Sequence, residues 1–146
     1  RPMNTTKLPA WRRWLVFLGL CESLRGLTNT PLWHLSPVRR IKKELQRANL
    51  PEGQTITGSE LLRVIANRCP YLDGGRKYQK ACSKMGFVHG QRELSAALTV
   101  GLRELEAEEV LEFGLLGDSS DALLMVPDPT LRTNSFNRVT IRAFSK

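Results

Sequence analysis

The residue types that most often catalyse reactions or bind metals are few in this chain and do not cluster. Its three cysteines, Cys21, Cys69 and Cys82, contain no Cys-x-x-Cys pair. Neither His34 nor His89 has metal-ligand spacing to a cysteine. An odd number of cysteines without such a pair favours reduced thiols over a disulfide framework. The sequence also lacks Gly-x-Ser-x-Gly and His-Glu-x-x-His. We therefore expect a non-catalytic protein without a metal or a cofactor.

The stretch Asp73-Gly-Gly-Arg76 is the one candidate for a phosphate-binding loop. No Lys-Ser or Lys-Thr follows it at the spacing of a nucleotide-binding loop. The Asp-Gly-Gly sequence is instead a strong signal for a turn. We interpret it as a connection between two helices.

Basic side chains suggest a different kind of chemistry, the binding of a polyanion. The net charge is +8 and the isoelectric point is about 9.9, which favours double-stranded DNA as a partner. Counting Lys, Arg, Asp and Glu gives +8 for residues 1–50, +3 for 51–100 and −3 for 101–146. Contacts with phosphates are therefore expected mainly from the first two thirds of the chain.

The predicted phosphate contacts lie on two segments. Residues 38–48 form an amphipathic pattern with Val38, Ile41 and Leu45 on one face. Its other side chains are basic and suit phosphates, an acidic protein surface or plain solvation; they are Arg39, Arg40, Lys42, Lys43 and Arg47. A second, short helical segment adds three lysines to the predicted site, namely Lys77, Lys80 and Lys84.

The predicted DNA-reading element is the stretch Arg92–Val126. Leucines recur at helical spacing from Leu94 to Leu105. An apolar run, a turn-forming stretch and a second apolar run then predict a β-hairpin, at residues 110–116, 117–121 and 122–126. A helix followed by such a ribbon is typical of a winged helix-turn-helix, in which the helix enters a groove and the ribbon is the wing.

The face of this helix opposite the leucines supplies the remaining predicted contacts, Arg92, Ser95, Thr99 and Arg103. Only the two arginines are side chains that usually read base edges. We therefore expect DNA binding to be directed mainly at phosphates, with weak sequence specificity.

The preceding segments complete the predicted fold. Pro9 begins a helix whose Trp11 and Trp14 are expected to anchor the core. Ser36-Pro37 begins a second helix, with the serine as its N-cap. Thr57-Gly-Ser-Glu60 has the spacing of a capping box and begins a third helix, which ends at Pro70.

The expected fold class is mainly α with a small antiparallel β wing. Residues 1–8 are predicted to be a flexible arm and residues 9–146 one winged-helix domain with a helical N-terminal extension. Alternation along residues 137–144 predicts a third strand. The apolar run Trp14–Cys21 is too short to span a membrane, so we expect a buried helix and a cytoplasmic protein. Since the first residue is not Met, the chain could be a fragment of a longer protein; its oligomeric state is left open.

An acidic cluster supports an alternative function. The glutamates at the end of the predicted helix and beyond would repel DNA and could dock a protein partner; they are Glu104, Glu106, Glu108, Glu109 and Glu112. Helix geometry spreads them around the axis, so they are not expected to converge on a metal. The alternative is thus a protein-protein adaptor on a winged-helix scaffold.

Several short motifs resemble one protein family. They are Trp-Leu-x-Phe-Leu-Gly-Leu at 14–20, Tyr-Leu-Asp-Gly-Gly-Arg at 71–76, Glu-Leu-Ser-Ala-Ala-Leu at 93–98 and Gly-Asp-Ser-Ser-Asp-Ala at 117–122. In this order the chain resembles the C-terminal winged-helix region of the DpdG-like proteins. The resemblance implies a non-catalytic component of a bacterial defence cluster linked to 7-deazaguanine-modified DNA, which could also bind a protein partner there.

Overall fold

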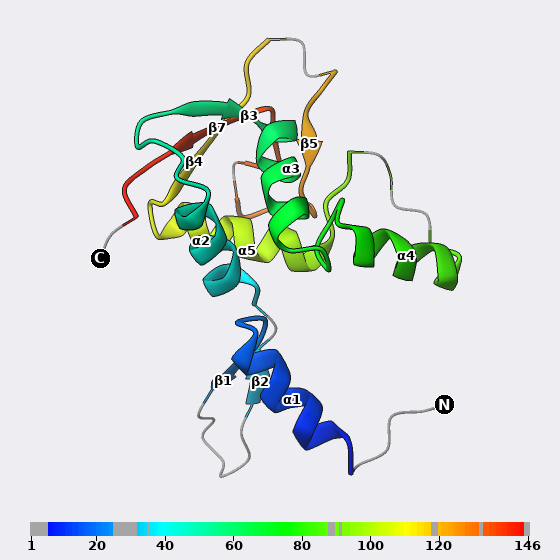
Figure 1. Ribbon diagram of the computed structural model, residues 1–146. Helices are drawn as coiled ribbons and strands as arrows, with labels where there is room; N and C mark the ends of the chain where they lie inside the picture. The colour runs from blue at the N-terminus through cyan, green and yellow to red at the C-terminus, as the bar shows by residue number, and fades with distance from the viewer. Residues whose placement is uncertain are drawn as a thin grey trace.

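The computed structural model describes residues 6–24, 32–34, 36–87, 90, 92–117, 120–131 and 133–144. Figure 1 shows the helices and strands that these residues form. The helices are α1 (Leu8–Phe17), α2 (Val38–Arg47), α3 (Gly58–Arg68), α4 (Arg76–Met85) and α5 (Ala96–Ala107). The strands are β1 (Glu22–Leu24), β2 (Leu32–His34), β3 (Thr55–Thr57), β4 (Leu111–Gly114), β5 (Leu123–Leu124), β6 (Ser135–Phe136) and β7 (Arg138–Ile141). The chain is therefore mainly α with a small antiparallel sheet, as the sequence predicts.

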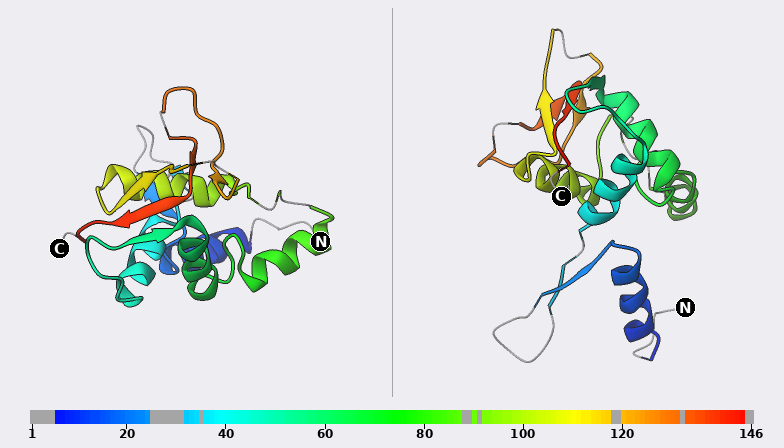
Figure 2. Two further views of the ribbon diagram at one scale, coloured as in Figure 1. Left: turned by 90° about the horizontal axis from the view of Figure 1, so that it is seen from above. Right: turned by 60° about the vertical axis from the view of Figure 1, so that its left-hand side comes forward.

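The first helix, α1, and the strand pair β1–β2 lie apart from the remaining elements. Figures 1 and 2 show this unit joined to the rest of the molecule just before α2. The side chains of Trp11 and Trp14 are 44% and 63% exposed, and α1 has no buried residue. The prediction that these tryptophans anchor the core and that this helix is buried is wrong, because α1 does not pack against the main body. Of the arm predicted at residues 1–8, residues 1–5 lie outside the described residues.

Two helix starts show how local sequence sets the fold. The capping box of α3 is present: the Thr57 hydroxyl accepts the Glu60 amide at 3.1 Å, and the Glu60 carboxylate accepts the Thr57 amide at 2.8 Å. The second helix begins one residue later than predicted. Pro37 occupies its N-cap position, and the Ser36 hydroxyl accepts the Val38 amide at 3.3 Å.

The main sheet joins segments that are distant in the sequence. Its strand order is β3-β7-β4, and both pairings are antiparallel. The predicted hairpin between residues 110–116 and 122–126 is wrong: β4 pairs with β7, while β5 pairs with β6. The predicted third strand is thus the central strand of the sheet, because both β3 and β4 use it as their hydrogen-bonding partner.

The hydrophobic core lies between this sheet and the helices α2, α3 and α5. Its fully buried side chains include Ile41, Leu98 and Phe136. Gly101 permits the close crossing of α5 over α2, since a Cβ there would lie 2.9 Å from Pro37 Cγ and 3.0 Å from Ile41 Cδ1. The sheet and these three helices form the base from which α4 and the segment after β4 extend.

Candidate nucleic-acid interface

The basic residues predicted on α2 are largely engaged in ion pairs within the chain. Glu44 is buried, and its carboxylate lies 3.0 Å from Arg40, 2.8 Å from Arg47 and 3.6 Å from Arg68. Lys42 lies 2.7 Å from Glu108. These pairs join α2 to α3 and to the end of α5, so much of the charge on α2 has a structural role. Arg39 and Lys43 are exposed.

Two nucleophile-bearing side chains near Arg40 are not activated. Burial raises the pKa of the Cys69 thiol and the pKa of the Tyr71 hydroxyl. Cys69 is fully buried at the end of α3, and a raised pKa keeps its thiol protonated. This cluster therefore offers no reactive thiolate.

The helix α4 presents a basic stripe to solvent. Gly75 is its N-cap, and Gly86 ends it in the left-handed conformation with φ of 67°. Successive helical residues are about 100° apart, so four cations fall on one arc of about 100°. They are Arg76, Lys77, Lys80 and Lys84, here called the α4 stripe, and all four are exposed.

The α4 stripe points away from the rest of the molecule. The half-buried Tyr78 and Cys82 lie on the opposite side of α4, toward the body. Figure 1 shows α4 projecting from the side of the molecule away from the C-terminus. Between described residues, none of the ion pairs involves the α4 stripe. Its cations are thus available to an external anion.

The turn before α4 is anchored to the start of α5. The Asp73 carboxylate is buried and accepts both the amide and the hydroxyl of Ser95, each at 2.6 Å. Ser95 in turn is the N-cap of α5, and its hydroxyl accepts the Leu98 amide at 3.2 Å. Burial, followed by the nearby Asp73 carboxylate, raises the pKa of Tyr78. Ser95 is half-buried, and its hydrogen bonds join the turn before α4 to the start of α5.

The segment after β4 folds back along α5. Leu124 exchanges backbone hydrogen bonds with Arg92 and Leu94, each at 2.8 Å. The Val126 amide donates to the Thr99 hydroxyl at 3.2 Å, and the Arg103 guanidinium donates to the Val126 carbonyl at 2.9 Å. We refer to residues 123–131, 133 and 134 as the strap.

The strap changes the roles of the residues predicted to read DNA. Thr99 is only 1% exposed, so the prediction that it faces a groove is wrong. Arg103 is half-buried and also donates to Asn134 at 2.9 Å, which ties it to the strap. Arg92 is exposed but lies before α5, which begins at Ala96. For Arg92, DNA contact stays a prediction.

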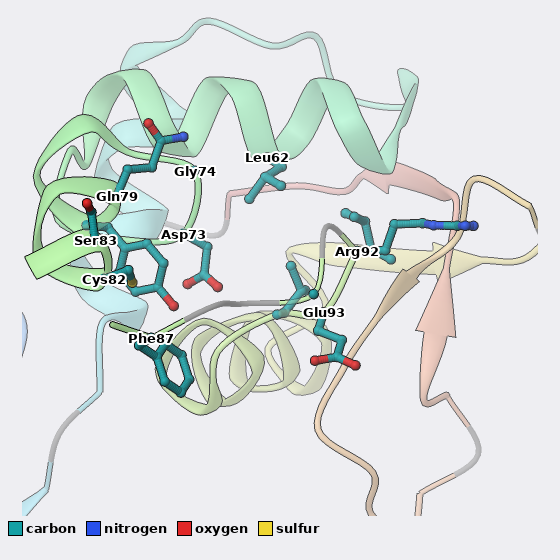
Figure 3. A pocket seen from close by; sticks show the side chains of 13 residues that line it. Leu62, Asp73, Gly74, Gln79, Cys82, Ser83, Phe87, Arg92 and Glu93 are labelled. Atoms are coloured by element: carbon teal, nitrogen blue, oxygen red, sulfur yellow. The ribbon is translucent and has the colours of Figure 1, made fainter. Parts of the chain in front are cut away.

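A hollow lies between α3, α4 and the start of α5, and Figure 3 shows its lining. Its volume is about 400 Å³, and Leu62, Asp73, Gln79 and Phe87 are among the lining residues. A second hollow of about 430 Å³ adjoins it and shares four of its residues, which are Leu62, Gly74, Arg92 and Leu123. We refer to the two neighbouring hollows together as the α3–α4 groove.

The α3–α4 groove contains residues that the sequence analysis did not single out. Ser59, Arg63 and Asn67 of α3 line its second part. Their i, i+4, i+8 spacing on an amphipathic helix was a signal for one exposed polar face. Arg76 was missed as well, although it directly precedes the three predicted lysines.

The acidic cluster is mostly used inside the chain. Glu104 accepts from the Ser36 hydroxyl at 2.7 Å and lies 3.3 Å from His34, while Glu112 is paired with Arg142. Burial raises the pKa of Glu106. Among the described residues, no group of three or more His, Cys, Asp or Glu side chains could hold a metal ion.

No helix formed by the described residues has the length and apolar character needed to cross a membrane.

Comparison with known proteins places the chain in a family. The sequence model of the DpdG-like family matches residues 2–130, a stretch that includes α1 to β5. No curated protein and no solved structure matches the chain. Because the match covers most of the sequence, the chain belongs to the DpdG-like family.

Proposed function

We propose that this protein is a non-catalytic DNA-binding subunit of a bacterial anti-phage defence or DNA-modification-linked system. Its membership of the DpdG-like family supports the defence context. Its net charge of +8 supports a polyanionic partner. The proposal places the protein in the cytoplasm, where the DNA of a bacterium is found.

The proposed scaffold is a modified winged helix-turn-helix. The order α2, β3, α3, α5, β4, β7 is that of three helices and a small sheet, with β4 and β7 as wing strands. The helix α4 is inserted between the two helices of the expected helix-turn-helix, α3 and α5. The strap lies along α5, where a DNA-reading helix would need an open face.

The α4 stripe is the observation that carries this proposal. Phosphate contacts give binding that is strong at low salt and independent of sequence. A row of exposed cations that is free of acidic partners among the described residues suits this role better than α2, whose cations hold Glu44 and Glu108. We therefore assign the main phosphate contacts to α4, and Arg92 stays a predicted contact.

A matched pair of triple variants tests this assignment. One variant carries Gln at Lys77, Lys80 and Lys84. The control carries Gln at three exposed cations elsewhere, Lys7, Arg13 and Arg138, so the loss of charge is the same. Binding to a blunt duplex is measured by electrophoretic mobility shift at several salt concentrations.

Loss of three phosphate contacts should reduce the slope of log K against log salt by about 2.7. Between 50 and 200 mM salt, this difference in slope means that the triple variant loses about 40-fold less affinity than the wild-type protein. The slope of the control variant should stay within about 0.9 of the wild-type slope, which is the contribution of one phosphate contact. Equal losses in both variants, or a wild-type protein that shifts no duplex at low salt, would contradict the proposal.

The adaptor function predicted as an alternative has less support. Three of the five clustered glutamates already have partners in the chain: Glu104 with His34 and Ser36, Glu108 with Lys42, and Glu112 with Arg142. Charge reversal of the cluster would therefore disturb the fold before it reported on a protein partner.

A further inference from the structure

The α3–α4 groove has a chemistry that differs from the α4 stripe beside it. Its shared floor is apolar, formed by Leu62 of α3 and Leu123 of β5. Its walls carry donors and acceptors together, from Arg63, Asn67, Gln79, Ser83, Arg92 and Asp121. A phosphate needs only donors and positive charge, whereas the edge of a nucleobase presents donors and acceptors side by side.

The acidic groups of the groove are already engaged with the protein. Asp73 accepts two hydrogen bonds from Ser95 at the floor. Asp121 accepts a hydrogen bond from the Asn137 side chain at 3.1 Å. The Glu93 side chain packs over Gly90, where a Cβ would lie 2.8 Å from Glu93 Cδ. These carboxylates therefore limit the net positive charge of the groove without filling it.

An aromatic side chain stands at the α4 end of the groove. Phe87 follows α4 and is 56% exposed, and it lines the groove together with Tyr78. In Figure 3, Phe87 lies on the side of α4, and Arg92 lies at the other end of the hollow. An exposed ring, an apolar floor and flanking cations are the features with which proteins hold unpaired bases.

The concave shape decides between paired and unpaired bases. Base edges in a duplex lie at the bottom of a groove and are reached by an element that protrudes from the protein. A hollow of about 400 Å³ cannot reach them, but it can receive a base that has left the stack. The helix that would protrude, α5, is covered on one side by the strap through Thr99 and Arg103.

We propose that the α3–α4 groove binds an unpaired nucleotide of a DNA strand whose phosphates contact the α4 stripe. Phe87 stacks on the base, Arg63 and Asn67 hydrogen-bond to its edge, and Arg92 contacts the adjoining phosphate. This inference rests on the proposed DNA-binding function and specifies the state of the DNA: a single-stranded end or gap beside a duplex.

The test compares fluorescently labelled DNA probes by anisotropy: a blunt duplex, the same duplex with a single-stranded extension, and a single strand. The variant is Phe87→Ala. The control is Phe17→Ala, which removes an exposed phenylalanine side chain from α1, outside the groove. Circular dichroism establishes that both variants fold, as expected for side chains that are 56% and 79% exposed.

The wild-type protein should bind the extended probe more tightly than the blunt duplex. Phe87→Ala should weaken binding of the extended probe at least about fivefold, the lower bound for loss of one stacked base. It should leave the blunt duplex unchanged, as should Phe17→Ala for both probes. Arg63→Ala combined with Asn67→Ala should reproduce the selective loss.

Other outcomes separate this inference from the function on which it rests. Equal affinity for the blunt and the extended probe overturns the inference and leaves duplex binding standing. A preference for the extended probe that survives both groove variants shows that another surface holds the unpaired strand. No binding to any probe at low salt overturns both proposals.

Discussion

Removing the Asp73 carboxylate should destabilise the fold more than its position in a turn suggests. Asp73 is 4% exposed and accepts two hydrogen bonds from Ser95, each at 2.6 Å. Hydrogen bonds that involve a charged group contribute about 1.5 to 3 kcal/mol each, and these two share one carboxylate. We therefore expect Asp73→Ala to lower the free energy of unfolding by about 3 kcal/mol.

The chain itself offers a matched control for this change. Asp128 also accepts an amide and a hydroxyl hydrogen bond from one residue, Thr130, at 2.9 and 2.6 Å. These bonds span two positions, whereas those of Asp73 span 22 and join α5 to the turn before α4. Asp128→Ala should therefore have a clearly smaller effect on stability.

Urea unfolding followed by far-ultraviolet circular dichroism is the suitable assay. Tryptophan fluorescence is not, because all three tryptophans lie in α1 and β2, apart from the main body. In thermal unfolding, each kcal/mol of lost stability lowers the melting temperature by about 2 to 4 °C, so Asp73→Ala should lower it by about 6 to 12 °C. A double-mutant cycle with Ser95→Ala should give a coupling energy of at least about 1 kcal/mol. Equal effects of Asp73→Ala and Asp128→Ala, or a coupling near zero, would refute the reasoning.

Two further predictions concern the helices around the core. Gly101→Ala should lower the urea midpoint although alanine favours helices by about 1 kcal/mol, because the added Cβ would lie 2.9 Å from the rigid ring of Pro37; a raised midpoint would contradict the close crossing of α2 and α5. Hydrogen bonds from the backbone and side chain of Thr57 lower the pKa of Glu60 below 4.5, so its stabilising effect is present above pH 4.5 and is lost as the pH falls through the lowered value. Glu60→Gln should therefore flatten the loss of stability below pH 4.5 in acid titrations; an unchanged acid profile in this variant would contradict the capping role of Glu60.

Local signals in the sequence were sufficient for the start of α3 and for the turn before α4. The capping box at Thr57 and Glu60 was visible as a spacing, because both partners lie within one turn. The turn at Asp73-Gly-Gly was visible because glycine there adopts a positive φ, 73° at Gly74. In both cases the residues that interact are neighbours in the sequence.

Pairing between distant segments could not be predicted in the same way. Residues 122–126 are a short apolar run and residues 138–141 a short alternating stretch, and either could pair with β4 by pattern alone. The choice is made by β3, since β7 satisfies the backbone groups of β3 and β4 together. The burial of Trp14 similarly depended on whether α1 packs on the body, which its own periodicity does not determine.

In the candidate site, too, interactions between sequence neighbours were predictable and interactions between distant residues were not. Lys80 and Lys84 were predictable as one face of a helix, because their spacing alone places them together. The pairing of Arg40, Lys42 and Arg47 on α2 with glutamates of the chain was not predictable. It depends on Glu44 being buried and on Glu108 reaching Lys42 across 66 positions.

The bond between Asp73 and Ser95 also bears on how the chain can be re-engineered. Because it fixes both ends of the segment 74–94 at one point, α4 and its flanking loops form a cassette inserted into a closed scaffold. A short glycine-containing linker in place of α4 would leave the core closed, since α4 has no buried residue and the buried Leu94 lies outside it. Cassettes with other charge patterns could then be exchanged on the same scaffold, which would separate its choice of ligand from its folding.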